Sequence, residues 1–323
     1  MFKLVALRSV SAFVNLSFAA ILIFLAACSE TQNSAPVAVD KAERVHPAEP
    51  AYPLQAVWAS RALDEPVTDL AFVGGSEPFL AAVYVSGALQ FLTLDGDRLT
   101  SAEALNITAL ADGQAVVLQD TPLNLFPGID RAGNLNLYTY SPVLDAPLTL
   151  PLLEDIGAAG LCAGPPLDET SLMQLAYWTE ADRQTLHTGR VEEKADVLIF
   201  SPLGERRSQS GPIASCNLYL DIQIAPAEDA LDLAKMRKMG KSFTLARTAE
   251  DRLTVTQANS KTVDIELLPG ITILLPDEIT ALAALSEVRY GGYPNGIIVI
   301  AGPVGQAHQI IFLNPTSLFE ALP

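Results

Sequence analysis

The sequence predicts an all-β fold, a β-propeller of about six blades with a range of five to seven. Three observations lead to this class. Strand-like runs dominate the chain after residue 56, tight turns join them into hairpins, and the hairpins recur every ~40 to 50 residues. A propeller blade is such a repeat, because one blade buries little apolar surface alone and stacks on its neighbours around an axis. About 267 residues follow residue 56, which at ~45 residues per blade gives roughly six blades.

The first predicted hairpin joins two apolar runs, 79–85 and 88–94, through Ser86 and Gly87. Glycine tolerates the positive φ angle of a two-residue turn, so this pair of residues predicts a tight hairpin. Later strands are predicted over 135–140, 172–178, 196–200, 242–247, 252–257, 296–301 and 308–313. The intervening turns are placed at 95–97, 130–134, 250–251 and 302–305, with a polar loop at 183–189. The sequence leaves open how the ring closes; one way is for a strand near Val57 to complete the blade formed by the last residues, 310–322.

Two segments interrupt the strand pattern and are predicted to be short helical insertions, near 226–239 and 276–287. The first opens on Pro226 and acidic residues and closes on Lys235 and Gly240, which matches the chemistry of helix termini. The second opens on a proline and acidic residues in the same way. Their apolar side chains are expected to cover an edge of the core.

The first 28 residues have the layout of a cleaved export signal. Lys3 and Arg8 form a basic start, an apolar run follows over 10–27, and two alanines directly precede Cys28. This layout resembles a bacterial lipoprotein signal peptide. The resemblance implies that residues 1–27 are removed and that Cys28 becomes the lipidated N-terminus. The alternative, a permanent transmembrane helix, is disfavoured because the run is at the short end of the ~17 to 25 residues that span a bilayer and no basic cluster follows it.

Residues 28–56 are predicted to be a flexible tether and 57–323 a single propeller-like domain. The tether is rich in proline, alanine and serine, and a chain of its length spans roughly 25 to 30 Å. One acyl chain binds a membrane only marginally, and the resemblance implies two or three on Cys28. Ser29 follows the cysteine in place of the aspartate that commonly retains lipoproteins at the inner membrane. The expected location is therefore the cell envelope, on the periplasmic face of the outer membrane rather than the inner membrane.

The charge balance of the chain is strongly acidic. It carries 20 basic and 37 acidic side chains, and removal of Lys3 and Arg8 with the signal leaves a net charge of −19. Such a field repels nucleic acid, so no nucleic-acid partner is expected. The expected partners are the membrane, through the lipid anchor, and an unknown envelope protein or small ligand.

Two cysteines remain after Cys28, at Cys162 and Cys216. In an oxidising periplasm they could form one disulfide, which by the loop-entropy argument contributes roughly 3 to 4 kcal/mol. Two separate buried thiols are the alternative, because both lie among apolar or small residues. No metal-binding spacing surrounds either cysteine.

The region of the first hairpin resembles the first blade of phytase-like β-propellers. Residues 64–70 read Asp-Glu-Pro-Val-Thr-Asp-Leu, and a strand, the Gly87 turn and the closing Leu-Asp-Gly at 94–96 follow. That family opens with an acidic pair before proline and continues with the same order of features. The segment 157–162, taken with the strands after it, is similar to a later blade of the family.

The resemblance implies calcium-dependent hydrolysis of phosphate esters, with Asp64 and Glu65 carried over as calcium ligands. Carboxylate oxygens bind Ca²⁺ at roughly 2.3 to 2.6 Å, and the bound cations neutralise phosphates and activate water. However, the family's basic and tyrosine phosphate ligands have no identified equivalents, and Thr68 stands where the family has an aromatic residue. These departures favour a non-catalytic propeller. As a structural alternative, Asp64 and Glu65 cap a turn before the strand.

No other motif in the sequence points to catalysis. The three histidines, His46, His187 and His308, are far apart, and no zinc-protease, nucleophile-elbow, phosphate-loop or dinucleotide pattern is found. The sequence therefore predicts a lipid-anchored envelope propeller that acts as a binding or assembly module. The alternatives are a calcium-dependent, phytase-like hydrolase and a structural envelope lipoprotein without a discrete site. Calcium is the one candidate cofactor.

Overall fold

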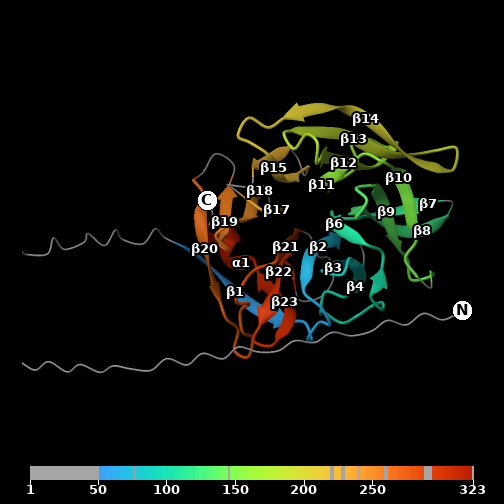
Figure 1. Ribbon diagram of the computed structural model, residues 1–323. Helices are drawn as coiled ribbons and strands as arrows, with labels where there is room; N and C mark the ends of the chain where they lie inside the picture. The colour runs from blue at the N-terminus through green and yellow to red at the C-terminus, as the bar shows by residue number, and fades with distance from the viewer. Residues whose placement is uncertain are drawn as a thin grey trace, which may run out of the picture. The chain divides into compact units, whose positions relative to one another are not determined.

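Hydrogen-bonded β-strands make up almost all the regular structure of the computed structural model (Figure 1). The structure describes residues 51–321 except 76, 119, 145, 219–221, 227–229, 239, 258–260 and 287–292. The compact unit that contains them extends over Ala48–Pro323. The predicted signal, Cys28 and the tether up to residue 50 lie outside the described residues. The predicted all-β class is confirmed.

The elements follow one another in a simple order. In chain order the strands are β1 (Tyr52–Ala59), β2 (Val67–Val73), β3 (Phe79–Tyr84), β4 (Ala88–Leu92), β5 (Glu103–Ala104), β6 (Ile107–Leu110), β7 (Gln114–Leu118), β8 (Thr121–Asp130), β9 (Leu135–Tyr140), β10 (Thr149–Leu153), β11 (Ala158–Gly164), β12 (Ser171–Thr179), β13 (Thr185–Lys194), β14 (Val197–Arg207), β15 (Ile213–Asn217), β16 (Gln223–Pro226), β17 (Asp232–Lys238), β18 (Lys241–Arg247), β19 (Leu253–Gln257), β20 (Val263–Leu268), β21 (Ala281–Leu285), β22 (Ile297–Val304) and β23 (Ala307–Asn314). One short helix, α1 (Thr316–Ala321), follows the last strand.

The strands form four small antiparallel sheets and one large sheet. The small sheets have the orders β2-β3-β4-β5, β10-β9-β8-β6 with β7 also paired to β8, β11-β12-β13-β14, and β15-β16. Apart from the pairing of β6 with β8, neighbours in each small sheet are neighbours in the chain, which is the expected result of successive hairpins. Gly87 occupies the turn between β3 and β4 with φ +84°. A Cβ atom there would lie 2.9 Å from the Cα of Asn106, so only glycine fits.

The large sheet has eight strands in the order β17-β18-β19-β20-β1-β23-β22-β21. It consists of two antiparallel groups joined through β1, which pairs antiparallel with β23 and parallel with β20. The N-terminal strand thus completes the sheet of the last residues, an arrangement that the sequence alone leaves open. It begins at Tyr52, five residues before the predicted start of the domain. The edge strands β17 and β21 also contact each other, so the sheet nearly closes on itself.

The large sheet divides into two four-stranded groups, one of β17 to β20 and one of β21 to β23 with β1. We call β2, β6, β11, β15, β17 and β21 the first strands of the four small sheets and of these two groups. Each first strand contacts the next one. The contacts run from β2 to β6, β6 to β11, β11 to β15, β15 to β17, β17 to β21, and β21 back to β2. These contacts close a ring of six strands, and the sheets follow one another round it in chain order (Figure 1).

Apolar side chains fill the spaces between neighbouring sheets. Strand β22 is buried on both faces: Ile298 and Ile300 pack with β17–β19, and Ile297 and Val299 pack with β2–β4. Between the first two small sheets, four aromatic rings meet with cross-sheet centroid distances of 4.8 to 5.8 Å. Each such pair contributes about 0.5 to 1.5 kcal/mol beyond its buried area. The core is therefore divided among the interfaces between sheets.

The two predicted helical insertions are wrong. Much of the segment 226–239 is strand β17, which pairs with β18 from Asp232 to Lys238. Its buried residues Ala234 and Met236 are two apart, the period of a strand, although alanine, lysine and methionine favour helices. Tertiary pairing outweighs this local preference.

The second segment, 276–287, contains strand β21. Ala281 and Ala283 pack on one core cluster, while Leu282 and Ala284 pack on another. A strand buried on both faces has no alternation of polar and apolar residues, so an Ala- and Leu-rich strand has the composition of a helix. The structure also places strand β13 where a polar loop was predicted at 183–189, and β13 lies between β12 and β14.

Candidate functional site

A central cavity lies inside the ring of six first strands. Its wider part has a volume of about 610 Å³ and its inner part about 200 Å³, and both parts are lined by Asp112, Ala163, Asn217 and Ala284. Each of the six strands, or the residues that directly follow it, contributes to the lining. We call the wider part the mouth, because it lies where β2, β6, β11, β15 and β21 end.

Small side chains on the first strands create this space. The lining includes Gly74 and Gly75 after β2, Gly164 on β11, and Ala284 on β21. On the inner part, alanines from β6, β11, β15 and β17 take the corresponding positions. Because none of these side chains extends more than one carbon from the backbone, the strands approach the axis without filling it.

Two aspartates connect β2 to β6 beside the cavity. The Asp69 carboxylate accepts hydrogen bonds from the backbone N–H groups of Leu70 at 2.8 Å and Leu110 at 2.7 Å. The Asp112 carboxylate accepts one from the N–H of Phe72 at 2.8 Å. Because β2 and β6 belong to different sheets, these backbone donors need partners outside a strand ladder, and the two carboxylates supply them.

Burial makes both carboxyl groups weak acids. Burial and, to a lesser extent, the nearby charge of Asp232 together raise the pKa of Asp69 to about 8 against the two backbone hydrogen bonds. Burial likewise raises the pKa of Asp112 to about 6, against the hydrogen bond from Phe72. At pH 7 Asp69 is therefore mostly protonated and Asp112 mostly ionised.

A third aspartate, Asp232 on β17, lines the inner part of the cavity. Burial raises its pKa, while the guanidinium of Arg247 opposes this shift. The Arg247 Nε donates to the Asp232 carboxylate at 2.8 Å, and its Nη1 donates to the carbonyl of Ile279 at 3.1 Å. This ion pair fixes the carboxylate against the wall between β17 and β21.

The mouth presents a different set of groups. Lys235 of β17, Asn217 at the end of β15, Gln114 at the start of β7 and Ser286 after β21 all line it. The Ser286 hydroxyl accepts a hydrogen bond from the backbone N–H of Arg237 at 2.9 Å. An ammonium, two carboxamides and a hydroxyl therefore converge on one opening, next to the Asp112 carboxyl.

The inner part contains a buried hydroxyl and a disulfide. The Ser215 Oγ atom is buried and has no hydrogen-bond partner among the described residues. Next to it, Cys162 of β11 and Cys216 of β15 form a disulfide with a Cα–Cα distance of 5.7 Å. The disulfide links two adjacent first strands, so it closes the ring covalently at this point.

The sequence-predicted calcium ligands lie away from the cavity. Asp64 and Glu65 precede β2, whereas the mouth follows it. The Asp64 carboxylate pairs with Arg98 at 3.0 Å with 71% of its side chain exposed, and Glu65 accepts from the N–H of Ser86 at 3.2 Å.

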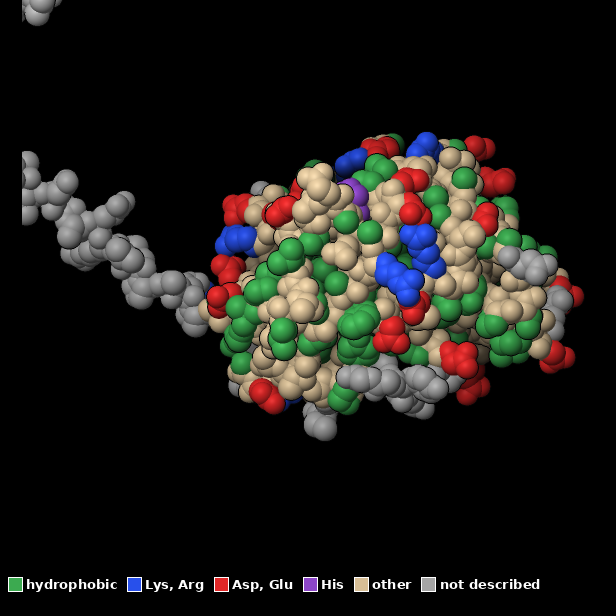
Figure 2. Space-filling model, turned by 90° about the horizontal axis from the view of Figure 1, so that it is seen from below, with side chains coloured by type: hydrophobic (Ala, Val, Ile, Leu, Met, Phe, Trp, Pro, Cys, Tyr) green, Lys and Arg blue, Asp and Glu red, His purple; other side chains and the backbone are tan. Residues whose placement is uncertain are grey.

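The structure does not gather further carboxylates around this pair. Among the described residues, no group of three or more histidine, cysteine, aspartate or glutamate side chains could hold a metal ion. Figure 2 shows the acidic side chains spread over one face of the domain rather than collected in one place. Cys28, the predicted lipidation site, lies outside the described residues.

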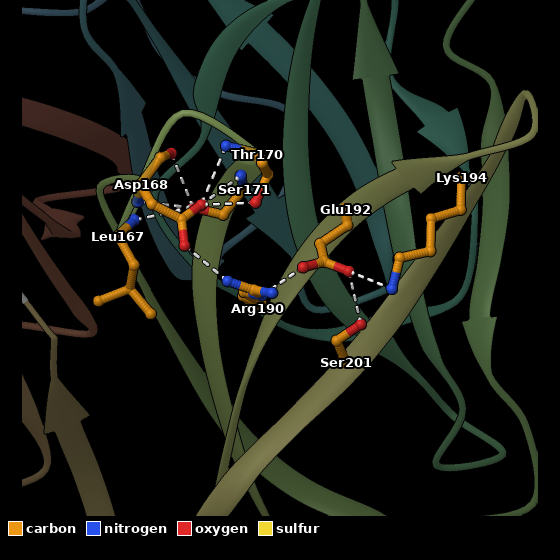
Figure 3. A network of polar contacts seen from close by, with 8 residues as sticks. All are labelled: Leu167, Asp168, Thr170, Ser171, Arg190, Glu192, Lys194 and Ser201. Atoms are coloured by element: carbon orange, nitrogen blue, oxygen red, sulfur yellow. Dashed lines mark hydrogen bonds and ion pairs between the residues drawn. The ribbon is translucent and has the colours of Figure 1, made fainter.

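A second polar cluster, which we call the outer network, lies on β13 and the strands beside it (Figure 3). Glu192 is its centre: it pairs with Arg190 and with Lys194 at 2.7 Å, and accepts from the hydroxyl of Ser201 at 2.8 Å. Arg190 also pairs with Asp168 at 2.6 Å. Hydrogen bonds from Lys194 and Ser201 lower the pKa of Glu192. Each carboxylate has cationic and hydrogen-bonding partners, as expected of a structural network.

The cavity carboxyls were not predicted from the sequence as functional residues. The sequence motifs predict no role for Asp69, Asp112 or Asp232. The signal that could have found Asp69 is a carboxylate inside the apolar run 67–73, because a buried strand tolerates a charge only with a dedicated partner.

No family model matches this chain, and no curated protein matches it. In the described part of the chain, no helix has the length and apolar character needed to cross a membrane.

Proposed function

We propose that this chain is a lipid-anchored envelope protein whose six-bladed β-propeller binds a ligand in the central cavity. The observation that carries the proposal is the cavity itself, with polar groups from different strands converging on its mouth. The proposal has three parts: the propeller architecture, the binding role and the anchor.

The ring of first strands supports the propeller. Six hairpin groups follow one another in chain order, and each places its first strand toward the common centre. The sixth group takes its outer strand, β1, from the N-terminus. A propeller closes its ring in this way because the last blade then binds both ends of the chain. Group β15-β16 has only two strands in the described part of the chain, and we count it as the fourth blade.

The dimensions and chemistry of the cavity support binding. Small-molecule sites commonly have volumes of ~300 to 1,000 Å³ and combine apolar walls with a few convergent polar groups. The mouth has both properties, with Phe72 and Leu285 beside Lys235 and the amides. The described lining serines have no histidine beside them to act as a base, so we propose binding rather than catalysis.

The sequence of the N-terminus supports the anchor. Cys28 ends a lipobox-like segment, and the first described strand begins at Tyr52. The intervening tether holds the start of the folded domain roughly 25 to 30 Å from the lipid. A Cys28→Ala variant should therefore leave the membrane fraction of cells, while a Ser29→Ala variant should remain in it. Retention of Cys28→Ala in membranes would contradict the anchor without bearing on the cavity.

Site-specific photocrosslinking tests the binding role. A photoreactive amino acid is placed at Gln114 or Ser286 in the mouth, and at Val143, which is 72% exposed and remote from the lining. After irradiation of cells, intact mass spectrometry and immunoblotting of the purified chain detect both small and protein adducts.

We expect one and the same adduct from both mouth positions and none from Val143. Adding Lys235→Glu, which reverses the charge at the mouth, should remove this adduct. Absence of an adduct at both mouth positions, or equal labelling at Val143, would refute the binding role.

A further inference from the structure

A second hollow, separate from the central cavity, lies beside the N-terminal strand. It has a volume of about 460 Å³ and is lined by Val57, Trp58, Asp95, Tyr293, Pro294, Asn295, Asn314 and Thr316. These residues come from β1, from the turn after β4, and from the segments that flank β22, β23 and α1. We call it the Trp58 groove.

Trp58 forms an aromatic surface in this groove. Its side chain is 50% exposed, and it is the only tryptophan, tyrosine or phenylalanine among the exposed large apolar side chains in the described part of the chain. The indole Nε1–H donates to the backbone carbonyl of Asp95 at 2.5 Å. The ring is therefore held in one orientation while half of it faces solvent. A fixed ring loses little conformational entropy on binding a ligand.

The rest of the groove supplies hydrogen-bonding groups. Asn314 accepts from the backbone N–H of Thr316 at 3.0 Å through its Oδ1, which leaves its amide N–H₂ for another partner. Asn295 donates to the Thr316 hydroxyl through Nδ2, which leaves its amide oxygen. Tyr293 is half-buried beside Asp95, whose charge contributes to raising the pKa of the phenol after the larger effect of burial.

Planar amides and a carboxylate around an aromatic ring match the chemistry of a sugar. A pyranose ring has an apolar face of C–H groups that stacks on an aromatic ring, and hydroxyl groups at its edge that both donate and accept. A flat apolar ligand would leave these amides unpaired at a cost of about 1 to 3 kcal/mol each when they are buried.

The charge of the groove restricts the sugar further. Asp95 is its one ionisable side chain besides the phenol, and neither lysine nor arginine occurs among its described lining residues. The whole chain is also acidic, with a formal net charge of −17. An anionic sugar would lose its hydration without gaining a cationic partner.

We propose that the Trp58 groove binds a neutral saccharide, with one pyranose ring stacked on Trp58. The binding itself is independent of the proposed function. We take the natural source of the saccharide to be an envelope glycan, and this assignment alone rests on the proposed envelope location.

Titration with trisaccharides tests the proposal on the full chain, purified in a detergent without a sugar headgroup. The probes are maltotriose, tri-N-acetylchitotriose and the anionic trigalacturonate. The chain contains two tryptophans; Trp178 is only 4% exposed but lines the inner part of the central cavity, so a change in fluorescence is assigned to Trp58 by its loss in Trp58→Ala. We expect saturable changes with at least one neutral trisaccharide and none with trigalacturonate.

Three variants assign the response to the groove. Trp58→Ala should weaken neutral-saccharide binding about tenfold or more in calorimetry, while the emission of Trp178 verifies that the variant is folded. Asp95→Asn should weaken neutral binding and increase binding of trigalacturonate. Leu274→Ala, which removes an exposed apolar side chain outside the groove, should bind like the wild type.

Several results would overturn the proposal. One is the absence of binding by both neutral probes, and another is unchanged affinity in a folded Trp58→Ala chain. A third comes from chains reconstituted in phospholipid vesicles: quenching of Trp58 by brominated acyl chains, without any saccharide response, would assign the groove to the membrane surface. The Cys28→Ala fractionation reports on the anchor alone, so failure of either inference can be distinguished from failure of the other.

Discussion

The central cavity and the outer network both hold shielded carboxylates, but different donors satisfy them. In the cavity, Asp69 and Asp112 receive hydrogen bonds from backbone N–H groups, and burial raises their pKa values to about 8 and about 6. In the outer network, Glu192 lies between Lys194 and Arg190, and its pKa is lowered. A backbone dipole offsets less of the desolvation of a carboxylate than a full positive charge does. The outer network therefore keeps one charge state near neutral pH, whereas the cavity changes its charge there.

The largest expected effect concerns Asp69. Its pKa is about 8 in the folded chain and about 3.9 in an unfolded one, so the folded state binds the proton more tightly. Stability should fall as the pH rises from about 4 to 8, by at most about 1.4 kcal/mol per pH unit. Asp69→Asn mimics the protonated group and should remove most of this slope. Melting temperatures at pH 5 and pH 8 test it, with the exposed carboxylate variant Asp64→Asn as control. If the stability of the wild type and of Asp69→Asn changes equally with pH, Asp69 does not have a raised pKa and the cavity does not differ from the outer network in this way.

The next largest effect concerns the disulfide beside the cavity. Replacing Cys162 and Cys216 together by alanine should lower the free energy of unfolding by about 3 to 4 kcal/mol, by the loop-entropy argument. Urea unfolding curves give this difference directly. Reduction of the wild-type chain should reproduce the curve of the double variant, and should leave the double variant itself unchanged. A double variant as stable as the oxidised wild type would mean that β11 and β15 are held together by packing alone.

A smaller effect is expected in the outer network, where the contribution to stability should rise with pH instead of falling. The lowered pKa of Glu192 contributes stability above its unfolded value of about 4.3, and this contribution is lost as the pH falls through the folded value. Glu192→Gln should be less stable than the wild type at pH 7, and the difference should shrink in acid. Melting curves from pH 7 down to pH 3 measure it. A difference that grows in acid would show that Glu192 is not held ionised by its neighbours.

The smallest effect is expected at the Asp64–Arg98 ion pair, whose side chains are 71% and 43% exposed. Exposed pairs contribute about 0 to 1 kcal/mol because water screens them, so Asp64→Asn should barely change the urea midpoint. Calcium should not raise the melting temperature of either chain, because the described residues gather no further carboxylates there. A calcium-dependent rise that Asp64→Asn abolishes would revive the phytase-like hydrolase.

Local signals in the sequence predicted the hairpins well. Gly87 requires a positive φ angle, and the pairs β3–β4, β8–β9, β18–β19 and β22–β23 all formed near their predicted turns. Helix α1 also had a local signal that was overlooked. Asn314 accepts a hydrogen bond from the N–H of Thr316, the first residue of the helix, and asparagine is a preferred residue just before a helix.

The cavity had no comparable signal. Asp69 and the backbone N–H of Leu110 are 41 residues apart, and the packing of the first small sheet against the second brings them together. The same holds for β17 and β21, whose helix-favouring residues become strands because neighbouring strands cover them. A sequence shows which side chains the chain contains. The pairing of distant strands decides which of them meet.

The position of β1 has a mechanical consequence. It lies between β20 and β23 and hydrogen-bonds to both. A force applied to the N-terminal end of the domain therefore pulls β1 along its own length, so that two rows of hydrogen bonds bear the load together instead of opening one at a time. A load on the N-terminal side of β1 is therefore resisted by shear between β1 and its two neighbouring strands.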